Sequence, residues 1–258
     1  MVFSIRIEGI EAVRAKLGVF SDRRFNAALA TAMTRTARAI DAEWSSQLEQ
    51  RFERPTRQTV RASVVSRAQA DRLQADVAIR DQVASSTGRA PVEWLATEER
   101  GGGRYIKRFE QALAAQGSLP AGWVTVPGPA AKLDAFGNVS RGQIVQVLAQ
   151  LGAQLSPGYQ RVISASAAKR AAKALATGRQ YVAVLPLKSA GTKEGRRPGV
   201  YVRTKTAFEP VFLYVRRVSY RPRLSLMQRG KAIAEQQLGQ EFLRAVQDSA
   251  ARLAARGA

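Results

Sequence analysis

Residues 25–52 read FNAALATAMTRTARAIDAEWSSQLEQRF. Apolar residues recur there every three or four positions, which places them along one face of an α-helix. These residues are Phe25, Leu29, Met33, Ala37, Ile40, Trp44, Leu48 and Phe52. Ser21 is a suitable N-cap, and Pro55 stops the helix because proline donates no backbone hydrogen bond. We therefore expect a long amphipathic helix with one buried face, around which the remaining elements pack.

Short strands are expected outside this helix. VFSIRI (2–7) alternates between apolar and polar residues. Residues 57–67 and 71–81 also alternate and are joined by a polar connection, which predicts an antiparallel pair. Further strands are expected later in the chain, at 180–186, 199–204 and 210–218. A second long helix is expected from Leu226 to Arg252, because Ala234, Leu238, Phe242, Val246 and Leu253 form an apolar stripe.

The order of these elements predicts an α+β fold, with long amphipathic helices at both ends flanking a mostly antiparallel sheet. A large mixed insertion is expected at about 85–177, with helices near 104–115, 141–151 and 164–176. Three parts follow from this pattern. We expect an N-terminal strand, long helix and strand pair at 1–84, an inserted helical and loop subdomain at 85–177, and C-terminal strands with a terminal helix at 178–258 that complete the core.

The stretch KLDAFGNVSRGQIVQVL (132–148) combines a turn with a helix start. Gly137 and Asn138 suit a turn with positive φ, and Ser140 with Gln143 matches a capping box. The glycines are not those of a phosphate-binding loop, because no Lys and Ser or Thr follow Gly142. This stretch is therefore interpreted as a structural joint without a ligand.

The charge of the chain favours an anionic partner. Its 258 residues carry 41 Lys and Arg against 20 Asp and Glu, a net charge of +21. Residues 161–223 hold fifteen of the basic residues against Glu194 and Glu209, a net charge of +13. Such a one-sign excess repels itself unless nucleic acid or an acidic protein faces it, although a solvated surface is the alternative. The residues expected to contact the partner are Lys188, Lys193, Arg196, Arg197, Arg203, Lys205, Arg216, Arg217, Arg221 and Arg223.

Catalytic chemistry has little support in the sequence. The chain has no His and no Cys, which excludes a histidine base, a thiolate nucleophile and a Cys/His metal site. Ser166 and Lys169 match S-x-x-K without its companion motifs, and the neighbours Glu98 and Glu99 would point apart. We expect no enzyme activity, no catalytic or metal-binding residues and no cofactor. A hydrolase or nuclease is an alternative, with an active site built from carboxylates that lie far apart in the sequence.

No apolar run is long enough for a membrane span, and no signal peptide opens the chain, so we expect a soluble protein made in the cytoplasm. Most of the aromatic residues near the basic region, among them Tyr201, Phe212 and Tyr214, are expected to be buried rather than to stack on bases.

Several blocks resemble those of a known family. They are RFERPT (51–56), RYIKRFEQAL (104–113), LPAGWVTVPG with KLDAFGNVSRGQIVQVL (119–148) and PVFLYVRRVSYRPRLSL (210–226). The order of parts is similar to that of the tail-completion and neck proteins of long-tailed bacteriophages, in particular the group of minor tail protein Z.

The resemblance implies a non-enzymatic virion protein that joins the tail tube to the head connector, made in the bacterial host cytoplasm. It implies a ring around the DNA channel, with six copies expected. The implied partners are other copies of the chain, the tail terminator or tail tube protein, proteins on the connector and portal side, and genomic DNA in the channel. The alternative is a sequence-independent nucleic-acid-binding protein that uses the basic region 161–223.

Overall fold

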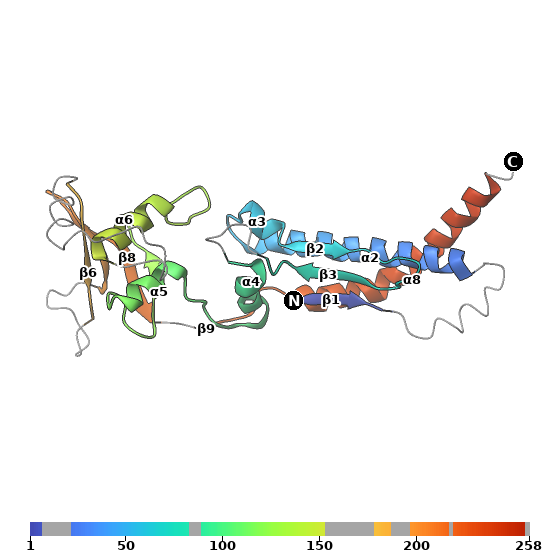
Figure 1. Cartoon of the computed structure of the whole chain (residues 1–258), viewed down its shortest axis with the longest axis horizontal. Coiled ribbons are helices and arrows are strands. Elements are labelled where there is room, and N and C mark those ends of the chain that lie inside the picture. Colours follow the sequence, from blue (N-terminus) through green and yellow to red (C-terminus); the bar gives the residue numbers. More distant parts are fainter. Residues whose placement is uncertain (7–21, 83–88, 153–177, 187–196, 217–218, 256–258) are drawn as a thin grey trace. The chain divides into compact units, whose positions relative to one another are not determined.

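The computed structural model describes residues 1–6, 22–82, 89–152, 178–186, 197–216 and 219–255. The chain folds into two compact units, each of which mixes helices with antiparallel sheet (Figure 1). Unit 1 consists of Met1–Gly102 and Tyr220–Ala258, and unit 2 of Gly103–Ser219. The fold is thus α+β with long helices near both ends, as the sequence predicts.

Unit 1 is a three-stranded antiparallel sheet packed against a pair of long helices. The strand order is β1-β3-β2, from β1 (Val2–Ile5), β2 (Ser63–Ser66) and β3 (Ala75–Ile79). The described residues of unit 1 form the helices α2 (Asp22–Arg51), α3 (Arg57–Val60), α4 (Pro91–Arg100) and α8 (Leu226–Ala254). Helix α2 contacts β2 and β3 on one side and α8 on another, so its apolar face is the centre of the unit.

The apolar face of α2 is buried as predicted. Met33, Ile40, Trp44 and Leu48 are fully inaccessible to solvent. Helix α8 approaches α2 closely at Gly230, where a Cβ atom would lie 3.3 Å from Ile40 Cγ2. The indole Nε1 of Trp44 donates a hydrogen bond to the carbonyl of Leu226 at 2.8 Å. The two helices are therefore joined by a buried hydrogen bond as well as by apolar contact.

Glu98 and Glu99 at the end of α4 bind the chain that leads into α8. The carboxylate of Glu99 accepts hydrogen bonds from the backbone N–H of Leu226 and Met227 at 2.9 and 3.1 Å, which caps the helix. The carboxylate of Glu98 accepts one from Arg223 Nε at 2.7 Å. Both carboxylates therefore have structural partners in the segment that leads into α8.

One local prediction in unit 1 needs correction. Residues 57–67 do not form one strand, because Thr56 Oγ1 caps a helical turn by accepting a hydrogen bond from Thr59 N at 3.2 Å. Strand β2 begins only at Ser63 and pairs with β3, as expected for the two segments. Gly101, which follows α4, is closely packed, since a Cβ atom there would lie 2.9 Å from the carbonyl oxygen of Tyr220.

In its described residues, unit 2 has a four-stranded antiparallel sheet and two helices. The strand order is β5-β8-β7-β6, from β5 (Trp123–Pro127), β6 (Gln180–Val184), β7 (Gly199–Arg203) and β8 (Phe208–Arg216). The helices are α5 (Arg108–Ala115) and α6 (Arg141–Leu151). A separate two-stranded ladder pairs β4 (Gly102–Gly103) with β9 (Ser219–Tyr220).

Unit 2 has its own core, formed mainly by Phe109, Leu113, Val147, Leu148 and Phe212. This contradicts the predicted boundaries at residues 84 and 177, because β6, β7 and β8 do not complete the core of the first 84 residues. The long strand β8 pairs with β5 on one side and β7 on the other. The predicted helical segment 164–176 lies outside the described residues. None of the helices in the described ranges has both the length and the apolar character needed to cross a membrane.

Candidate basic interaction surface

Unit 2 carries most of the net positive charge of the protein. Residues 103–219 contain eighteen Lys and Arg against four Asp and Glu, a net charge of +14. The longer unit 1 contains 23 against 16, a net charge of +7. The charge excess thus follows the division into folding units, which makes the exposed cations of unit 2 the candidate functional site.

Three of these cations lie at one end of the four-stranded sheet. Arg203 ends β7, and Lys205 lies in the turn between β7 and β8. Gln180 pairs with Arg203, so Arg179 belongs to the same end of the sheet. All three basic residues are exposed. We name Arg179, Arg203 and Lys205 the basic sheet end.

The turn that carries Lys205 is fixed by its own hydrogen bonds. Thr204 N donates to the carbonyl of Ala207 at 2.8 Å, and Thr204 Oγ1 accepts from Ala207 N at 2.9 Å. The charges are therefore presented from an ordered hairpin, which lowers the entropy cost of binding.

Two other predicted contact residues lie elsewhere on unit 2. Arg216 is at the end of β8, where its guanidinium lies over the Trp123 ring at 5.8 Å from the centroid. Arg197 precedes β7, and its carbonyl accepts a hydrogen bond from Tyr201 OH at 2.7 Å. Both side chains are exposed, yet neither belongs to the basic sheet end.

Arg221 and Arg223 belong to unit 1. Besides its bond to Glu98, the Arg223 guanidinium lies over the Phe52 ring at 5.4 Å. The hydrogen bond and the charge of Glu98 raise the pKa of Arg223 above its ordinary value. This charge therefore has an ion-pair partner within unit 1, and the contact of Arg223 with an anion stays a prediction. Lys188, Lys193, Arg196 and Arg217 lie outside the described residues.

A buried carboxylate supports the sheet. Glu110 at the start of α5 is fully buried and forms an ion pair with Arg104. It also accepts hydrogen bonds from Lys107 N at 2.7 Å, and from Thr125 N and Thr125 Oγ1 at 2.8 Å each. Sequence reasoning did not identify this group, although an acidic residue three positions after Lys107 indicates a helix start. Glu110 thereby attaches α5 to the edge strand β5.

The predicted capping box at Ser140 and Gln143 is wrong. Ser140 is the N-cap of α6, but its side chain makes no capping bond. Gln143 is buried, and its amide accepts from Lys132 N at 2.6 Å and donates to the carbonyl of Ala130 at 3.0 Å. Gln143 thus holds the preceding loop, because that loop folds back across the first turn of α6. The expected positive φ is found at Gly137, at 78°.

The other predicted chemistry can be placed in part. Tyr201, Phe212 and Tyr214 are buried, as expected, and Tyr201 stacks on Phe208 with ring centroids 4.8 Å apart. Ser166 and Lys169 lie outside the described residues. Within the described part of the chain, no three Asp or Glu side chains come together as metal ligands would. No family model, curated protein or solved structure compared with this chain matches it.

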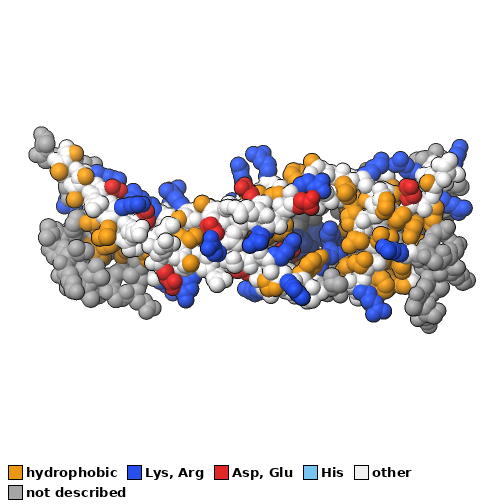
Figure 2. Space-filling model, turned by 180° about the vertical axis from the view of Figure 1, so that it is seen from behind, with side chains coloured by type: hydrophobic (Ala, Val, Ile, Leu, Met, Phe, Trp, Pro, Cys, Tyr) orange, Lys and Arg blue, Asp and Glu red, His pale blue; other side chains and the backbone are white. Residues whose placement is uncertain are grey.

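The exposed Lys and Arg side chains of unit 2 suit electrostatic recognition of an anionic partner. Figure 2 shows Lys and Arg side chains at many places on the visible face and fewer Asp and Glu. Exposed cations raise the local concentration of an anionic partner and speed its encounter. In unit 2 the described side chains that supply this potential are attached to a sheet with a well-packed core.

Proposed function

We propose that the protein is a structural component of a tailed bacteriophage particle, a tail-completion or neck protein that joins the tail tube to the head connector. In this proposal it forms a ring around the DNA channel, and unit 2 faces an anionic neighbour. The observation that carries the proposal is the concentration of charge, because two thirds of the excess, +14 of +21, lies in one independently packed unit.

The positions of the family-like blocks in the fold support the same proposal. RYIKRFEQAL contains the buried Glu110 and its ion-pair partner Arg104. The block at 132–148 contains the loop held by Gln143, and the block at 210–226 contains the segment bound by Glu98. The resembling blocks therefore contain residues that hold loops and segments in place. A shared fold would be expected to show its likeness at such residues.

The second candidate function is sequence-independent binding of nucleic acid. The basic sheet end favours it, since three exposed cations on one ordered edge can contact successive phosphates. Binding of free duplex DNA by the purified protein, with an affinity that falls steeply as salt rises, would favour this function.

Locating the protein tests the first proposal. Cryo-electron microscopy of purified particles is expected to show it between the tail tube and the head connector. Particles made without it are expected to accumulate as separate heads and tails. Its absence from purified particles would overturn the proposal, and DNA binding alone would then identify the second function.

A further inference from the structure

Strand β6 lies at an edge of the sheet in unit 2, and among the described strands it pairs only with β7. Tyr181 N donates a hydrogen bond to Gln150 Oε1 at 2.8 Å, so this N–H faces away from β7. Backbone groups alternate in direction along a strand, so the N–H of Ala183 faces away from β7 as well. It has no hydrogen-bond partner within the described residues. The second half of β6 therefore has an open backbone edge.

The opposite edge of the same sheet, at β5, is closed. Thr125 N donates to the carboxylate of Glu110 at 2.8 Å, and Arg104 donates to the carbonyl of Thr125 at 3.4 Å. Pro127 has no N–H to offer. Proteins use such devices to keep further strands from pairing with an edge. Strand β6 contains neither proline nor a charged residue, and Leu185, which follows it, is an apolar residue that is 46% exposed.

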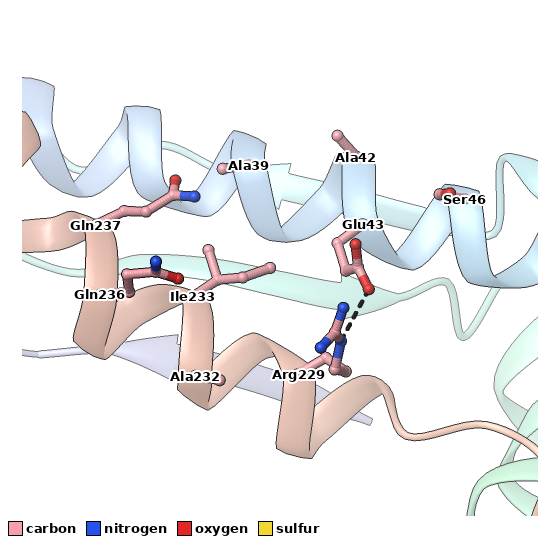
Figure 3. A pocket seen from close by; sticks show the side chains of 9 residues that line it. All are labelled: Ala39, Ala42, Glu43, Ser46, Arg229, Ala232, Ile233, Gln236 and Gln237. Atoms are coloured by element: carbon pink, nitrogen blue, oxygen red, sulfur yellow. Dashed lines mark hydrogen bonds and ion pairs between the residues drawn. The ribbon is translucent and has the colours of Figure 1, made fainter.

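The open edge begins beside three cations that have no carboxylate partner. Arg179 immediately precedes β6, and Arg203 and Lys205 complete the basic sheet end. None of the three forms an ion pair within the described part of the chain. Exposed cations of unit 1 differ in this respect, since Arg229 pairs with Glu43 at 3.0 Å beside the hollow between α2 and α8 (Figure 3). The charges of the basic sheet end are therefore free to pair with a partner.

We propose that an extended segment of a partner protein, with acidic residues next to its strand-forming stretch, adds to β6 as a further strand of the sheet. Its backbone hydrogen-bonds to the N–H of Ala183, and its carboxylates pair with the basic sheet end. Segments that bind in this way are held by main-chain hydrogen bonds, and their side chains supply the specificity.

The charge of unit 2 distinguishes this partner from a second copy of the chain. A second β6 at the same edge would bring another unit with a net charge of +14 against the first, and like charges repel. Nucleic acid can pair with the cations, but its phosphates and bases do not form the regular ladder of hydrogen bonds that a strand edge accepts. An acidic strand matches both the edge and the charges.

This inference names the anionic neighbour that the proposed function requires, and in that respect it rests on the proposed function. Strand addition itself is tested with purified protein and a peptide. Absence of the protein from virions would therefore overturn the proposed function and leave strand addition standing. Failure to bind the peptide would overturn this inference alone.

The probe is a fluorescent peptide in which alternating valine and threonine are flanked at both ends by glutamate. Its central sequence matters little, because main-chain hydrogen bonds hold an added strand. The comparison peptide has lysine in place of every glutamate. Fluorescence anisotropy with the full-length chain measures the Kd, and amide hydrogen exchange measures protection at Ala183.

Ala183→Pro removes the outward N–H and leaves the hydrogen bonds to β7, which come from the neighbouring positions, so an edge strand can accept it. Ala183→Val is the matched control, because it adds comparable bulk and keeps the N–H. A second variant reverses the three cations of the basic sheet end to Glu. Its control reverses three exposed cations of unit 1, Arg38, Arg67 and Arg72. Circular dichroism and thermal melting establish that each variant is folded.

The glutamate peptide is expected to bind the wild type and Ala183→Val, and to slow exchange of the Ala183 amide. Binding to Ala183→Pro is expected to be lost. Reversal of the basic sheet end is expected to weaken binding about tenfold more than its control does, because attraction at three exposed sites becomes repulsion.

Equal binding of the glutamate peptide by Ala183→Pro and the wild type would overturn the inference, as would equally tight binding of the lysine peptide. Sedimentation of the wild type as an oligomer that Ala183→Pro dissociates would also overturn it, since a second copy would then occupy the edge. If the glutamate peptide does not bind at all, the inference is wrong. Duplex DNA that binds the wild type but not the reversed variant would then identify nucleic acid as the partner.

Discussion

Gln143 forms two hydrogen bonds from a nearly inaccessible position, with 4% of its surface exposed. Its partners are the carbonyl of Ala130 and the backbone N–H of Lys132. Neither of these residues lies in a helix or strand. Loss of this amide removes two hydrogen bonds to part-buried backbone groups, which costs about 1–3 kcal/mol in total. The side chain therefore contributes to stability through the loop rather than through the end of α6.

We accordingly expect Gln143→Ala to lower the free energy of unfolding by about 1–3 kcal/mol. Ser140→Ala is the matched control, and it should change stability little because the Ser140 side chain makes no capping bond. Urea denaturation measures both effects, and amide hydrogen exchange at Lys132 should become faster only in Gln143→Ala. Equal losses from the two substitutions would restore the capping box as the explanation.

Tyr214 is a buried residue whose hydroxyl group lacks a hydrogen bond in the described part of the chain. Its ring is 4% exposed. Burial raises the pKa of this phenol well above its ordinary value of 10. The folded state therefore keeps the proton while the unfolded chain releases it above pH 10.

Tyr214→Phe is expected to leave the free energy of unfolding at pH 7 unchanged or to raise it by up to about 1 kcal/mol, because the removed hydroxyl is unpaired. Above pH 10 the wild type should lose stability more steeply than the variant, since ionisation of Tyr214 favours the unfolded chain. Urea denaturation at pH 7 and at pH 10–11 checks both statements. A variant that is less stable at pH 7 would mean that the hydroxyl has a favourable partner.

At the scale of elements, α2 was predictable and the division of the sheet was not. The spacing of Phe25, Leu29, Met33 and their successors is a local property, and it defines the buried face of α2 without knowledge of the partners. Strand β5 was missed because Gly122 and Pro127 bound a short segment that resembles a loop. Its place beside β8 depends on a partner some ninety residues away, which no local pattern encodes.

The candidate basic surface could likewise be predicted from the sequence only in part. The exposure of Arg203 and Lys205 follows from charge, and the position of Arg179 beside them follows only from the pairing of β6 with β7. Arg223 pairs with Glu98, 125 positions away in the chain, and this ion pair was not visible in the sequence. Local chemistry thus identified many of the cations but not which of them lie together.

The pairing of α2 with α8 gives a sharp test of unit 1. Trp44→Ala removes a fully buried ring and the hydrogen bond to Leu226, so it is expected to lower the free energy of unfolding by about 3–5 kcal/mol. Leu243→Ala is the control, because Leu243 is largely exposed on α8. Thermal and urea denaturation measure the difference. If the two variants are equally stable, α2 is not the core helix of unit 1.

At the scale of the whole molecule, we expect the exposed charges of unit 2 to act in binding and its apolar core to stabilise the fold. The described cations of the basic sheet end contribute nothing to the apolar clusters, and Glu110 inside the unit is already paired. Removal of the exposed charges should therefore change binding without changing the fold.

The basic sheet end supplies the last prediction. Reversal of Arg179, Arg203 and Lys205 to Glu lowers the net charge from +21 to +15 and should leave the melting temperature unchanged, because all three side chains are exposed. The control reverses Arg38, Arg67 and Arg72, which are exposed on unit 1. The measurement that checks this is the rate at which infectious particles form when each purified protein is added to an extract that contains heads and tails but lacks this protein.

The variant of the basic sheet end should join heads to tails more slowly than the control, and the deficit should be largest at low salt. Screening over about 10 Å at 0.1 M salt weakens attraction to the anionic neighbour in the wild type and repulsion in the variant, so the two rates should converge as salt rises. Equal rates for both charge reversals at low salt would show that the basic sheet end has no special part in joining. A deficit that is the same at every salt concentration would contradict an electrostatic role, since exposed charges act on encounter rates through a field that salt screens.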